Sequence, residues 1–474
     1  MTSSQTRRPN ILFIMSDDHA AHAISAYGSR INQTPHLDRI AQGGMRLDAC
    51  LCTNSICAPS RASILTGTYS HVNGVLTLRE GLDSSREDLP NVAKLLRGAG
   101  YQTAIFGKWH LGHQPENHPV GFDTWRVLPG QGKYHDPDFW EMPDAEHPEA
   151  YRKTYQGYAT DLITDFSLDW LRARDRNRPY FLMLHHKAPH RPWQPDEKHA
   201  QMYEDVEVPY PETFDDDYAT RSQAAKIAHM RMEHLNDTDT KGPPPPGLSP
   251  QEERKWKYQR YIRDYLKCIA SIDDNVGRVL DYLDEDGSAD DTVIIYTSDQ
   301  GFFLGDHGWF DKRFFYEESL RMPFLIRYPR EIAAGSTDEH IVLNTDFAPL
   351  FLDYAGESAP AAMHGHGTSF RSVLRGTTPA DWRTSMYYRY FMHMDNAHHT
   401  TAHYGVRTDR HKLIYYYEPE PGPQEWELFD LQEDPRELKN VYGEPEYAGV
   451  TRDLERELRR LREQVGDLTN DWES

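Results

Sequence analysis

The stretch NILFIMSDDH, residues 10–19, decides the fold, because an apolar run suited to a buried strand ends abruptly in Ser16, two aspartates and a histidine. Three later apolar runs share this pattern: YQTAIF (101–106) leads into GKWH, YFLML (180–184) into HHKAPH, and TVIIY (292–296) into TSDQG. In open parallel sheets, ligands bind beyond the carboxyl ends of the strands. We therefore expect the four polar clusters to converge on one site.

Helical patterns lie between these apolar runs, an alternation that is typical of an α/β fold. We expect helices at residues 34–42, 89–97, 159–172 and about 257–283. The predicted fold is therefore a mainly parallel central sheet flanked by helices.

The composition changes after about residue 380. Residues 383–391 and 404–417 are rich in Tyr and β-branched residues, as antiparallel strands are, and residues 448–468 have the pattern of a charged amphipathic helix. We expect a larger α/β domain over residues 1–380 and a smaller C-terminal α+β subdomain over residues 381–474. The Pro-rich segment NDTDTKGPPPPGLSP, residues 236–250, predicts an exposed irregular insertion.

Charge and hydropathy argue against several classes of partner. The 474 residues carry a formal charge of −22, and a field of that sign repels nucleic acids and anionic membranes. No apolar run approaches the roughly 18 residues that a membrane helix needs. The N-terminal apolar run is too short for a signal peptide, so we expect a cytoplasmic protein that binds neither nucleic acid nor membrane.

Two of the strand-end clusters carry oxygen ligands. Asp17 and Asp18 follow the first strand, and Asp299 and Gln300 follow the late one. Carboxylate and amide oxygens suit Ca²⁺ or Mg²⁺ rather than zinc. The alternative is a pair of solvated acidic loops, and the placement of both pairs at strand ends favours the metal site.

Cys57 is the second chemical feature. The segment NSICAPSRASILTG, residues 54–67, places Pro59 where the first turn of a helix accepts it, so Cys57 lies at or before a helix N-terminus that favours a developing anion. Arg61 is within reach of the same point. These features leave two interpretations, a nucleophile and a buried structural cysteine, whereas Cys50 and Cys52 alternate as buried strand residues.

The segment CAPSRASILTG resembles the type I sulfatase signature CxPSRxxxLTG. The stretches SDDH, GKWHLG, APHRPW and TSDQG are similar to further motifs of that family, and the likeness covers most of residues 9–330. The C-terminal ELFDLQEDPRELKN is similar to the end of many of these enzymes. The resemblance implies an alkaline-phosphatase-like fold.

The resemblance also implies a mechanism. A maturation enzyme, a transient partner, converts the cysteine at the position of Cys57 to formylglycine, whose hydrate has two hydroxyls. One hydroxyl, with Asp299 as base, attacks the sulfur of a sulfate ester, and the second allows sulfate to leave as the aldehyde reforms. The implied ligands of the divalent ion, usually Ca²⁺ and alternatively Mg²⁺, are Asp17, Asp18, Asp299, Gln300 and the modified Cys57. Many relatives carry Asn in place of Gln300.

The remaining site residues follow from the same motifs. Arg61 matches the residue that supports the aldehyde hydrate, and the groups that match sulfate-binding positions are Lys108, His110, His190 and Lys312. His190, and also Lys312, can protonate the leaving oxygen. A basic pocket inside an acidic chain would explain how a protein of charge −22 binds an anionic substrate.

Residues 297–319 look like those of carbohydrate sulfatases, including enzymes that act on 6-O-sulfated N-acetylglucosamine. We expect a sulfated sugar as substrate, with His307, His398 and His403 as substrate contacts; a solvated histidine-rich loop is the alternative for the last two. Three functional alternatives stay open: a phosphonate monoester or phosphodiester hydrolase, a choline or aryl sulfatase, and a catalytically silent relative that binds sulfated glycans.

Overall fold

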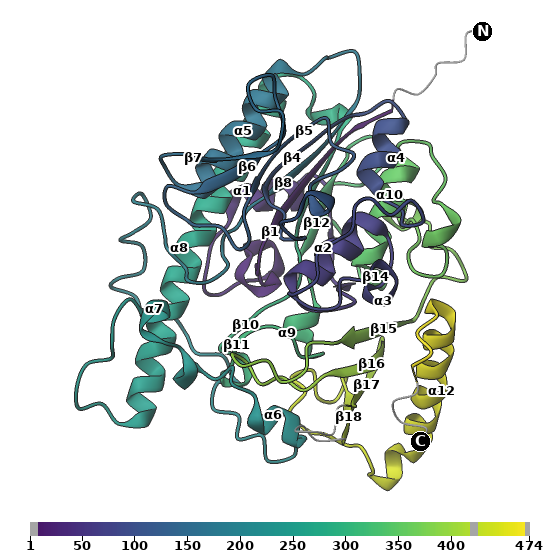
Figure 1. Ribbon diagram of the computed structural model, residues 1–474. Helices are drawn as coiled ribbons and strands as arrows, with labels where there is room; N and C mark the ends of the chain where they lie inside the picture. Colours follow the sequence, from purple (N-terminus) through teal and green to yellow (C-terminus); the bar gives the residue numbers. More distant parts are fainter. Residues whose placement is uncertain (1–7, 418–424, 470–474) are drawn as a thin grey trace.

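The computed structural model describes residues 8–417 and 425–469, and its centre is a ten-stranded sheet of order β13-β2-β12-β9-β1-β8-β4-β5-β6-β7 (Figure 1). The strands are β1 (Asn10–Ser16), β2 (Met45–Leu47), β4 (Gln102–Lys108), β5 (Thr124–Leu128), β6 (Asp138–Glu141), β7 (Tyr151–Thr154), β8 (Tyr180–His185), β9 (Thr292–Ser298), β12 (Phe324–Arg327) and β13 (Ser336–Asp338).

The middle of this sheet is parallel. Strands β9, β1, β8, β4 and β5 run in one direction, whereas β12 and the β6-β7 pair are antiparallel to their neighbours. Met15 lies opposite both His185 and Thr297, so the residues that follow β1, β8 and β9 leave the sheet at the same level. The predicted α/β fold and the convergence of these strand ends are confirmed.

Helices cover both faces, and alternate β1 residues bury against each layer. Ile11, Phe13 and Met15 belong to the core cluster that includes residues of α2 (Cys57–Thr66), α4 (Val92–Gly98) and α10 (Phe347–Tyr354). Leu12 and Ile14 belong to the core cluster that includes residues of α1 (Pro35–Gln42), α5 (Ala159–Ala173) and α8 (Pro250–Glu285). A strand buried on both faces has no polar alternation, which explains the continuous apolar run NILFIM.

The long helix and the Pro-rich insertion differ from the predictions. Helix α8 starts at Pro250, because the Ser249 hydroxyl caps it by accepting the Glu252 N–H at 3.3 Å. The Pro-rich insertion is exposed over most of its length, as expected, but the prediction that it has no regular structure was wrong: α7 (Asp237–Thr240) forms within it, and Asp239 is only 2% exposed. In the described part of the chain, no helix has the length and apolar character to cross a membrane.

The C-terminal part forms an antiparallel sheet of order β15-β16-β17-β18 beside α12 (Ala448–Val465) (Figure 1). Its strands are β15 (Ser385–Tyr390), β16 (His403–Thr408), β17 (His411–Tyr416) and β18 (Glu425–Asp430). One face joins the main core through Tyr388 and Ile414, and the other packs with α12 through Tyr404 and Leu413. Because the two parts share a core, the domain boundary near residue 380 stays a prediction.

The smaller elements connect these layers. They are the paired strands β3 (Cys50–Leu51) with β14 (Val342–Leu343) and β10 (Phe303–Leu304) with β11 (Phe310–Asp311), and the short helices α3 (Ser70–Asn73), α6 (Gln223–Ile227), α9 (Glu317–Leu320) and α11 (Arg371–Leu374).

Candidate active site

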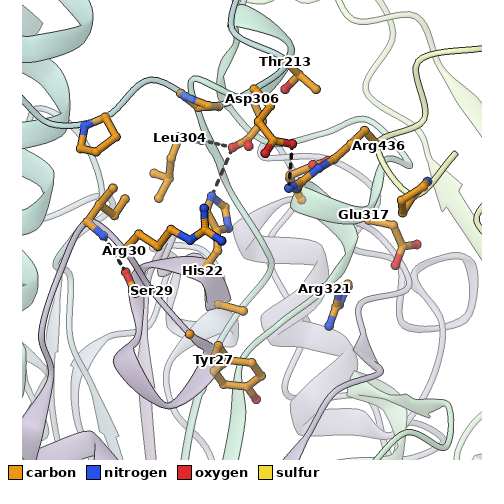
Figure 2. A pocket seen from close by; sticks show the side chains of 18 of the residues that line it. His22, Tyr27, Ser29, Arg30, Thr213, Leu304, Asp306, Glu317, Arg321 and Arg436 are labelled. Atoms are coloured by element: carbon orange, nitrogen blue, oxygen red, sulfur yellow. Dashed lines mark hydrogen bonds and ion pairs between the residues drawn. The ribbon is translucent and has the colours of Figure 1, made fainter.

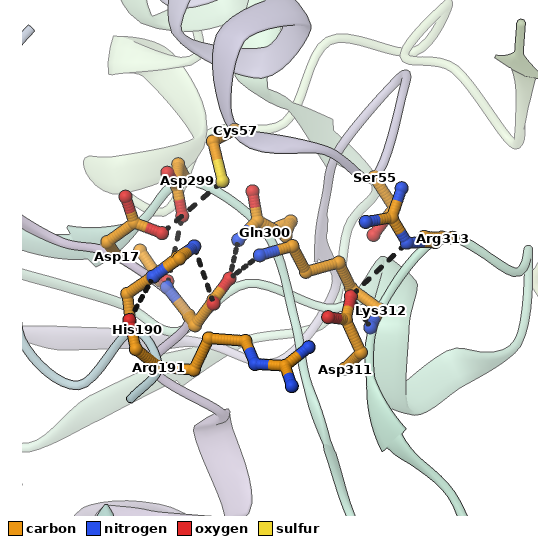
Figure 3. Close-up of polar contacts among 12 residues, drawn as sticks. Asp17, Ser55, Cys57, His190, Arg191, Asp299, Gln300, Asp311, Lys312 and Arg313 are labelled. Atoms are coloured by element: carbon orange, nitrogen blue, oxygen red, sulfur yellow. Dashed lines mark hydrogen bonds and ion pairs between the residues drawn. The ribbon is translucent and has the colours of Figure 1, made fainter. Parts of the chain in front are cut away.

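The residues that follow β1 and β9 meet the first turn of α2 (Figure 3). The Cys57 thiol donates to Asp17 Oδ1 at 3.4 Å, and the Asp18 N–H donates to Asp299 Oδ1 at 3.2 Å. Helix α2 begins at Cys57, as the Pro59 pattern predicted, and the Ser60 hydroxyl donates to the Asp299 carbonyl. The helix start and two strand ends therefore form one buried cluster.

Three carboxylates in this cluster lie close enough to share a cation. Asp17, Asp18 and Asp299 each offer an oxygen within 4.8 Å of the others, and all three are at most 1% exposed. Burial and the charges of Asp17 and Asp299 raise the pKa of Asp18 to about 8, against the opposing effect of Lys312. Burial also raises the pKa of Asp299, whereas Lys108 and other neighbouring cations overcome burial and hold that of Asp17 well below its usual value.

Gln300 completes an oxygen-rich set. Its Nε2 donates to Asp18 Oδ1 at 2.5 Å, and its buried Oε1 has no hydrogen-bond partner among the residues that the structure describes. A buried acceptor without a partner is costly, and one that lies beside three carboxylates fits a hard divalent cation. The three carboxylates and the Gln300 amide oxygen therefore fit Ca²⁺ or Mg²⁺.

Three cationic side chains surround the carboxylates. Arg61 donates to Asp299 Oδ2 at 2.9 Å, to Asp17 Oδ2 at 3.1 Å and to the Lys108 carbonyl at 2.6 Å. The Lys312 ammonium lies 2.5 Å from Asp18 Oδ1, and the Lys108 ammonium forms a close ion pair with Asp17. All three cations are at most 3% exposed, so their charges are little screened by water.

Two histidines adjoin the same cluster. His190 Nε2 lies 3.8 Å from Asp18 Oδ2, and burial with the charge of Lys108 lowers the pKa of the ring well below its usual value. His110 follows β4 with φ 58°, and its buried Nδ1 has no hydrogen-bond partner within residues 8–417 and 425–469. Burial and Lys108 also lower the His110 pKa, so both rings are neutral before an anion binds.

Comparison with known proteins identifies the family. A family model described as "Sulfatase" matches residues 9–357. This chain belongs to the sulfatase family. A second model, "N-sulphoglucosamine sulphohydrolase, C-terminal", matches residues 305–464. The membership makes the protein an enzyme, a sulfuric ester hydrolase.

Individual relatives cover almost the whole sulfatase chain. An N-acetylglucosamine-6-O-sulfatase of Bacteroides thetaiotaomicron is 43% identical over 98% of this chain and 88% of its own. A solved structure of a protein in complex with its substrate D-glucosamine-2-N,6-O-disulfate superposes with a TM-score of 0.91 at 41% identity, covering 99% of this chain and 100% of that one. A phosphonate monoester hydrolase of Agrobacterium radiobacter, at 22% identity and a TM-score of 0.75 with 97% and 96% coverage, shares the fold.

The predicted substrate contacts of this sulfatase fall into two groups. His398 lies beside the cluster. Its Nε2 is 3.1 Å from Oδ2 of Asp311, and Asp311 directly precedes Lys312 in the chain. His403 is fully buried among aromatic rings, and burial lowers its pKa to about 4. His307 is also fully buried.

The contacts of His307 are structural. Its Nδ1 lies 3.0 Å from Asp216, and its Nε2 lies 3.7 Å from Glu318. Burial alone would lower the His307 pKa, but these carboxylates outweigh burial and raise it to about 9. Among the described residues, no contact joins His307 or His403 to Cys57 or to the carboxylates and cations around it, and their role as substrate contacts stays a prediction.

Sequence reasoning missed several side chains around the sulfatase cluster. Asp311 and Arg313 flank Lys312, are each 3% exposed, and both contact His398, with Arg313 NH2 3.3 Å from its Nε2. Because Asp311 and Arg313 are adjacent to Lys312 in the sequence, they could have been predicted as site residues. Gln131 accepts from the Lys108 ammonium at 2.6 Å and comes from a loop whose sequence carries no such signal.

A separate cavity of about 610 Å³ is lined by residues such as Tyr27, Arg30, Glu317 and Arg321 (Figure 2). His22 in its wall is paired with Asp306 at 3.2 Å. None of the side chains clustered around Cys57 lines this cavity, so the sulfatase chemistry is assembled elsewhere.

Proposed function

We propose that this sulfatase hydrolyses the 6-O-sulfate of N-acetylglucosamine or a closely related glucosamine sulfate. The observation that carries the proposal is the assembly of Cys57, three carboxylates and three cations at one point of the fold. Similarity over nearly the whole chain to an N-acetylglucosamine-6-O-sulfatase supports the choice of sugar.

The nucleophile in this proposal is Cys57 after conversion to formylglycine. Burial, followed by the charge of Asp17, raises the pKa of the thiol, so an unmodified Cys57 would stay protonated and would be a poor thiolate nucleophile. The carboxylate of Asp299 takes a proton from the attacking hydroxyl, and Arg61 Nε holds that carboxylate by donating to its Oδ2 at 2.9 Å.

Asp17, Asp18, Asp299 and Gln300 would hold the divalent ion, with Ca²⁺ as the proposed metal. When bound, that ion supplies positive charge that polarises the reacting oxygens. The chain itself supplies Lys108, His110 and Lys312 around the sulfate oxygens. Their burial strengthens attraction to an anion, because little water competes with them.

His190 is the proposed acid for the leaving oxygen, with Lys312 as a second donor. His190 Nδ1 lies 2.7 Å from the Arg191 carbonyl, which only accepts, so Nδ1 carries a proton and Nε2 faces the cluster. A bound sulfate ester adds negative charge beside the ring and favours proton uptake at Nε2. Protonation of the leaving alkoxide then becomes possible.

The sugar would lie beyond Lys312, against Asp311, Arg313 and His398. Together they present a carboxylate, a guanidinium and an imidazole in one buried group, which offers donors and acceptors to ring hydroxyls. Because a hydroxyl both donates and accepts, this mixed set suits a sugar better than an aryl group.

The test combines mass spectrometry of the Cys57 peptide with sulfate release from 6-O-sulfated N-acetylglucosamine. Formylglycine with sulfate release is expected, and Cys57→Ala should abolish release while leaving the fold intact. A protein that contains formylglycine but hydrolyses only phosphonate esters or aryl sulfates would contradict the sugar assignment. Tight binding without turnover would instead indicate a silent glycan-binding protein.

A further inference from the structure

The His190 imidazole is aimed by a main-chain carbonyl rather than by another side chain. Its Nδ1 donates to the Arg191 carbonyl at 2.7 Å, and this bond orients Nε2 toward Asp18. Figure 3 shows the His190 ring directed at the carboxylates while the Arg191 guanidinium points away from them. Any shift of the peptide after Arg191 would therefore turn the ring, so the contacts that hold residues 190–193 decide where Nε2 lies.

Two buried residues hold this segment from the inside. The Lys187 ammonium donates to the same Arg191 carbonyl at 3.3 Å, and the Tyr134 hydroxyl donates to the His190 carbonyl at 2.5 Å. Lys187 also lies 4.5 Å from the centre of the Tyr134 ring, and both residues are 1% exposed. These contacts fix the inner side of the segment.

The insertion holds the same segment from the outside. Asp239 of α7 accepts from Arg191 Nε at 3.1 Å and from its NH2 at 2.5 Å. Lys241, which ends α7 with φ 56°, donates to the carbonyls of Pro192 and Trp193, each at 2.7 Å.

Lys241 is itself anchored. Its ammonium lies 3.1 Å from Asp264 of α8, the helix beside which α7 packs (Figure 1). The Lys241 ammonium thereby connects the carbonyls of Pro192 and Trp193 to Asp264 of α8. Asp239 is 2% exposed, whereas the Lys241 side chain is 29% exposed, so Lys241 can be changed with little disturbance of the core.

We propose that the insertion is a clamp in which Asp239 and Lys241 are positioning residues for His190. The clamp holds residues 191–193 against Lys187 and Tyr134, so that Nε2 meets the leaving oxygen of the substrate. The inference rests on the proposed function, in which His190 protonates that oxygen. A misplacement of a catalytic group by about 1 Å can cost about 100-fold in rate.

The test is Lys241→Met, assayed on two esters. The alkoxide released from 6-O-sulfated N-acetylglucosamine needs a proton, whereas the phenolate released from 4-nitrophenyl sulfate leaves without one. We expect kcat on the sugar sulfate to fall by about tenfold with KM within about twofold, and kcat on the aryl sulfate to change by less than about twofold. Lys241→Arg, which keeps the charge and the donors, should restore most of the loss.

Two further variants complete the design. Lys94→Met removes an ammonium that donates to the Ser84 carbonyl at 2.6 Å, away from this site, and should leave both activities unchanged. Asp239→Asn keeps the shape of its side chain and should show the same ester-dependent loss, which guards against misfolding of Lys241→Met.

The outcomes separate the two proposals. An equal loss on both esters, or no loss on either, would overturn the clamp. Failure of the formylglycine-containing wild type and of Lys94→Met to release sulfate from the sugar would overturn the proposed function instead.

Discussion

Gln300 offers the sharpest test of the metal site. Its Nε2 donates to Asp18 Oδ1 at 2.5 Å, while its buried Oε1 has no hydrogen-bond partner in the described part of the chain. If that oxygen is a metal ligand, replacing the amide by an apolar group of similar size should affect the metal-bound protein far more than the metal-free protein. The informative variants are Gln300→Leu, which removes the oxygen, and Gln300→Asn, which retains it one methylene closer to the backbone.

The magnitudes follow from these two contacts. In the metal-free protein, Gln300→Leu loses a hydrogen bond to a carboxylate, worth about 1.5–3 kcal/mol, and removes a buried unsatisfied acceptor that costs about 1–3 kcal/mol. These contributions oppose each other and nearly cancel. In the metal-bound protein the acceptor is satisfied, so the variant forfeits about 1–3 kcal/mol of binding, which corresponds to a Ca²⁺ affinity about 5- to 150-fold weaker.

The assay is calcium titration by calorimetry, combined with thermal melting with and without Ca²⁺. Binding to the folded state raises the melting temperature, so Gln300→Leu should melt like the wild type in chelator and gain less from added Ca²⁺. Gln300→Asn should keep more affinity than Gln300→Leu. Equal Ca²⁺ affinities for wild type and Gln300→Leu would refute Gln300 as a ligand. A large difference in melting temperature between the two proteins in chelator would show that the two opposing contributions in the metal-free protein do not cancel.

Three other expectations address the nucleophile, the C-terminal sheet and pH. Cys57→Ser should stop after one turnover with a sulfo group retained on the protein, because a single hydroxyl has no route to expel sulfate; mass spectrometry detects the adduct, and continued turnover would contradict the diol chemistry. Lys412→Met should cost about 3–5 kcal/mol, because it removes the ammonium that pairs with the buried carboxylates of Glu437 and Glu317, of which Glu317 also pairs with Arg407; adding Glu437→Gln should restore part of the melting temperature. Protonated His307, whose pKa is raised to about 9, stabilises the fold fully below its unfolded pKa of about 6.5, and this contribution is lost as the pH rises through about 9. The difference in melting temperature between wild type and His307→Gln should therefore narrow over that range, and a constant difference would show that His307 does not titrate there.

The sequence predicted the sheet and the cluster because both depend on local patterns. The run Asn10–Met15 and the polar residues after it specify a buried strand and its exit from the sheet, and the register of β1 with β8 and β9 places those exits side by side. Pro59 likewise specifies the start of α2 at Cys57. In each case a few adjacent residues contain the physical reason for the structure.

The contacts that orient the side chains were not predictable in this way. Asp239 and Lys241 lie in a Pro-rich segment whose composition indicates irregular structure, yet α7 forms there and binds residues 191–193. Gln131 reaches Lys108 from a loop. The sequence likewise does not show that His307 and His403 are fully buried, because the residues that cover them lie far away in the chain. These outcomes depend on packing between segments far apart in the chain.

Charge balance supports the proposal that the site binds both a divalent metal and an anionic substrate. The carboxylates of Asp17, Asp18 and Asp299 face the cations of Arg61, Lys108 and Lys312, so these six groups sum to zero when all are ionised. Burial, followed by the charges of Asp17 and Asp299, raises the pKa of Asp18 to about 8, and a further cation beside it would favour its ionised form. With the proposed divalent ion bound and Asp18 ionised, the cluster would carry two excess positive charges, and the single charge of a sulfate monoester would lower this excess to one. The proton that the nucleophile gives to Asp299 stays within the cluster and does not change this sum. In a chain of charge −22, we therefore expect removal of the metal to weaken sulfate binding as well as turnover.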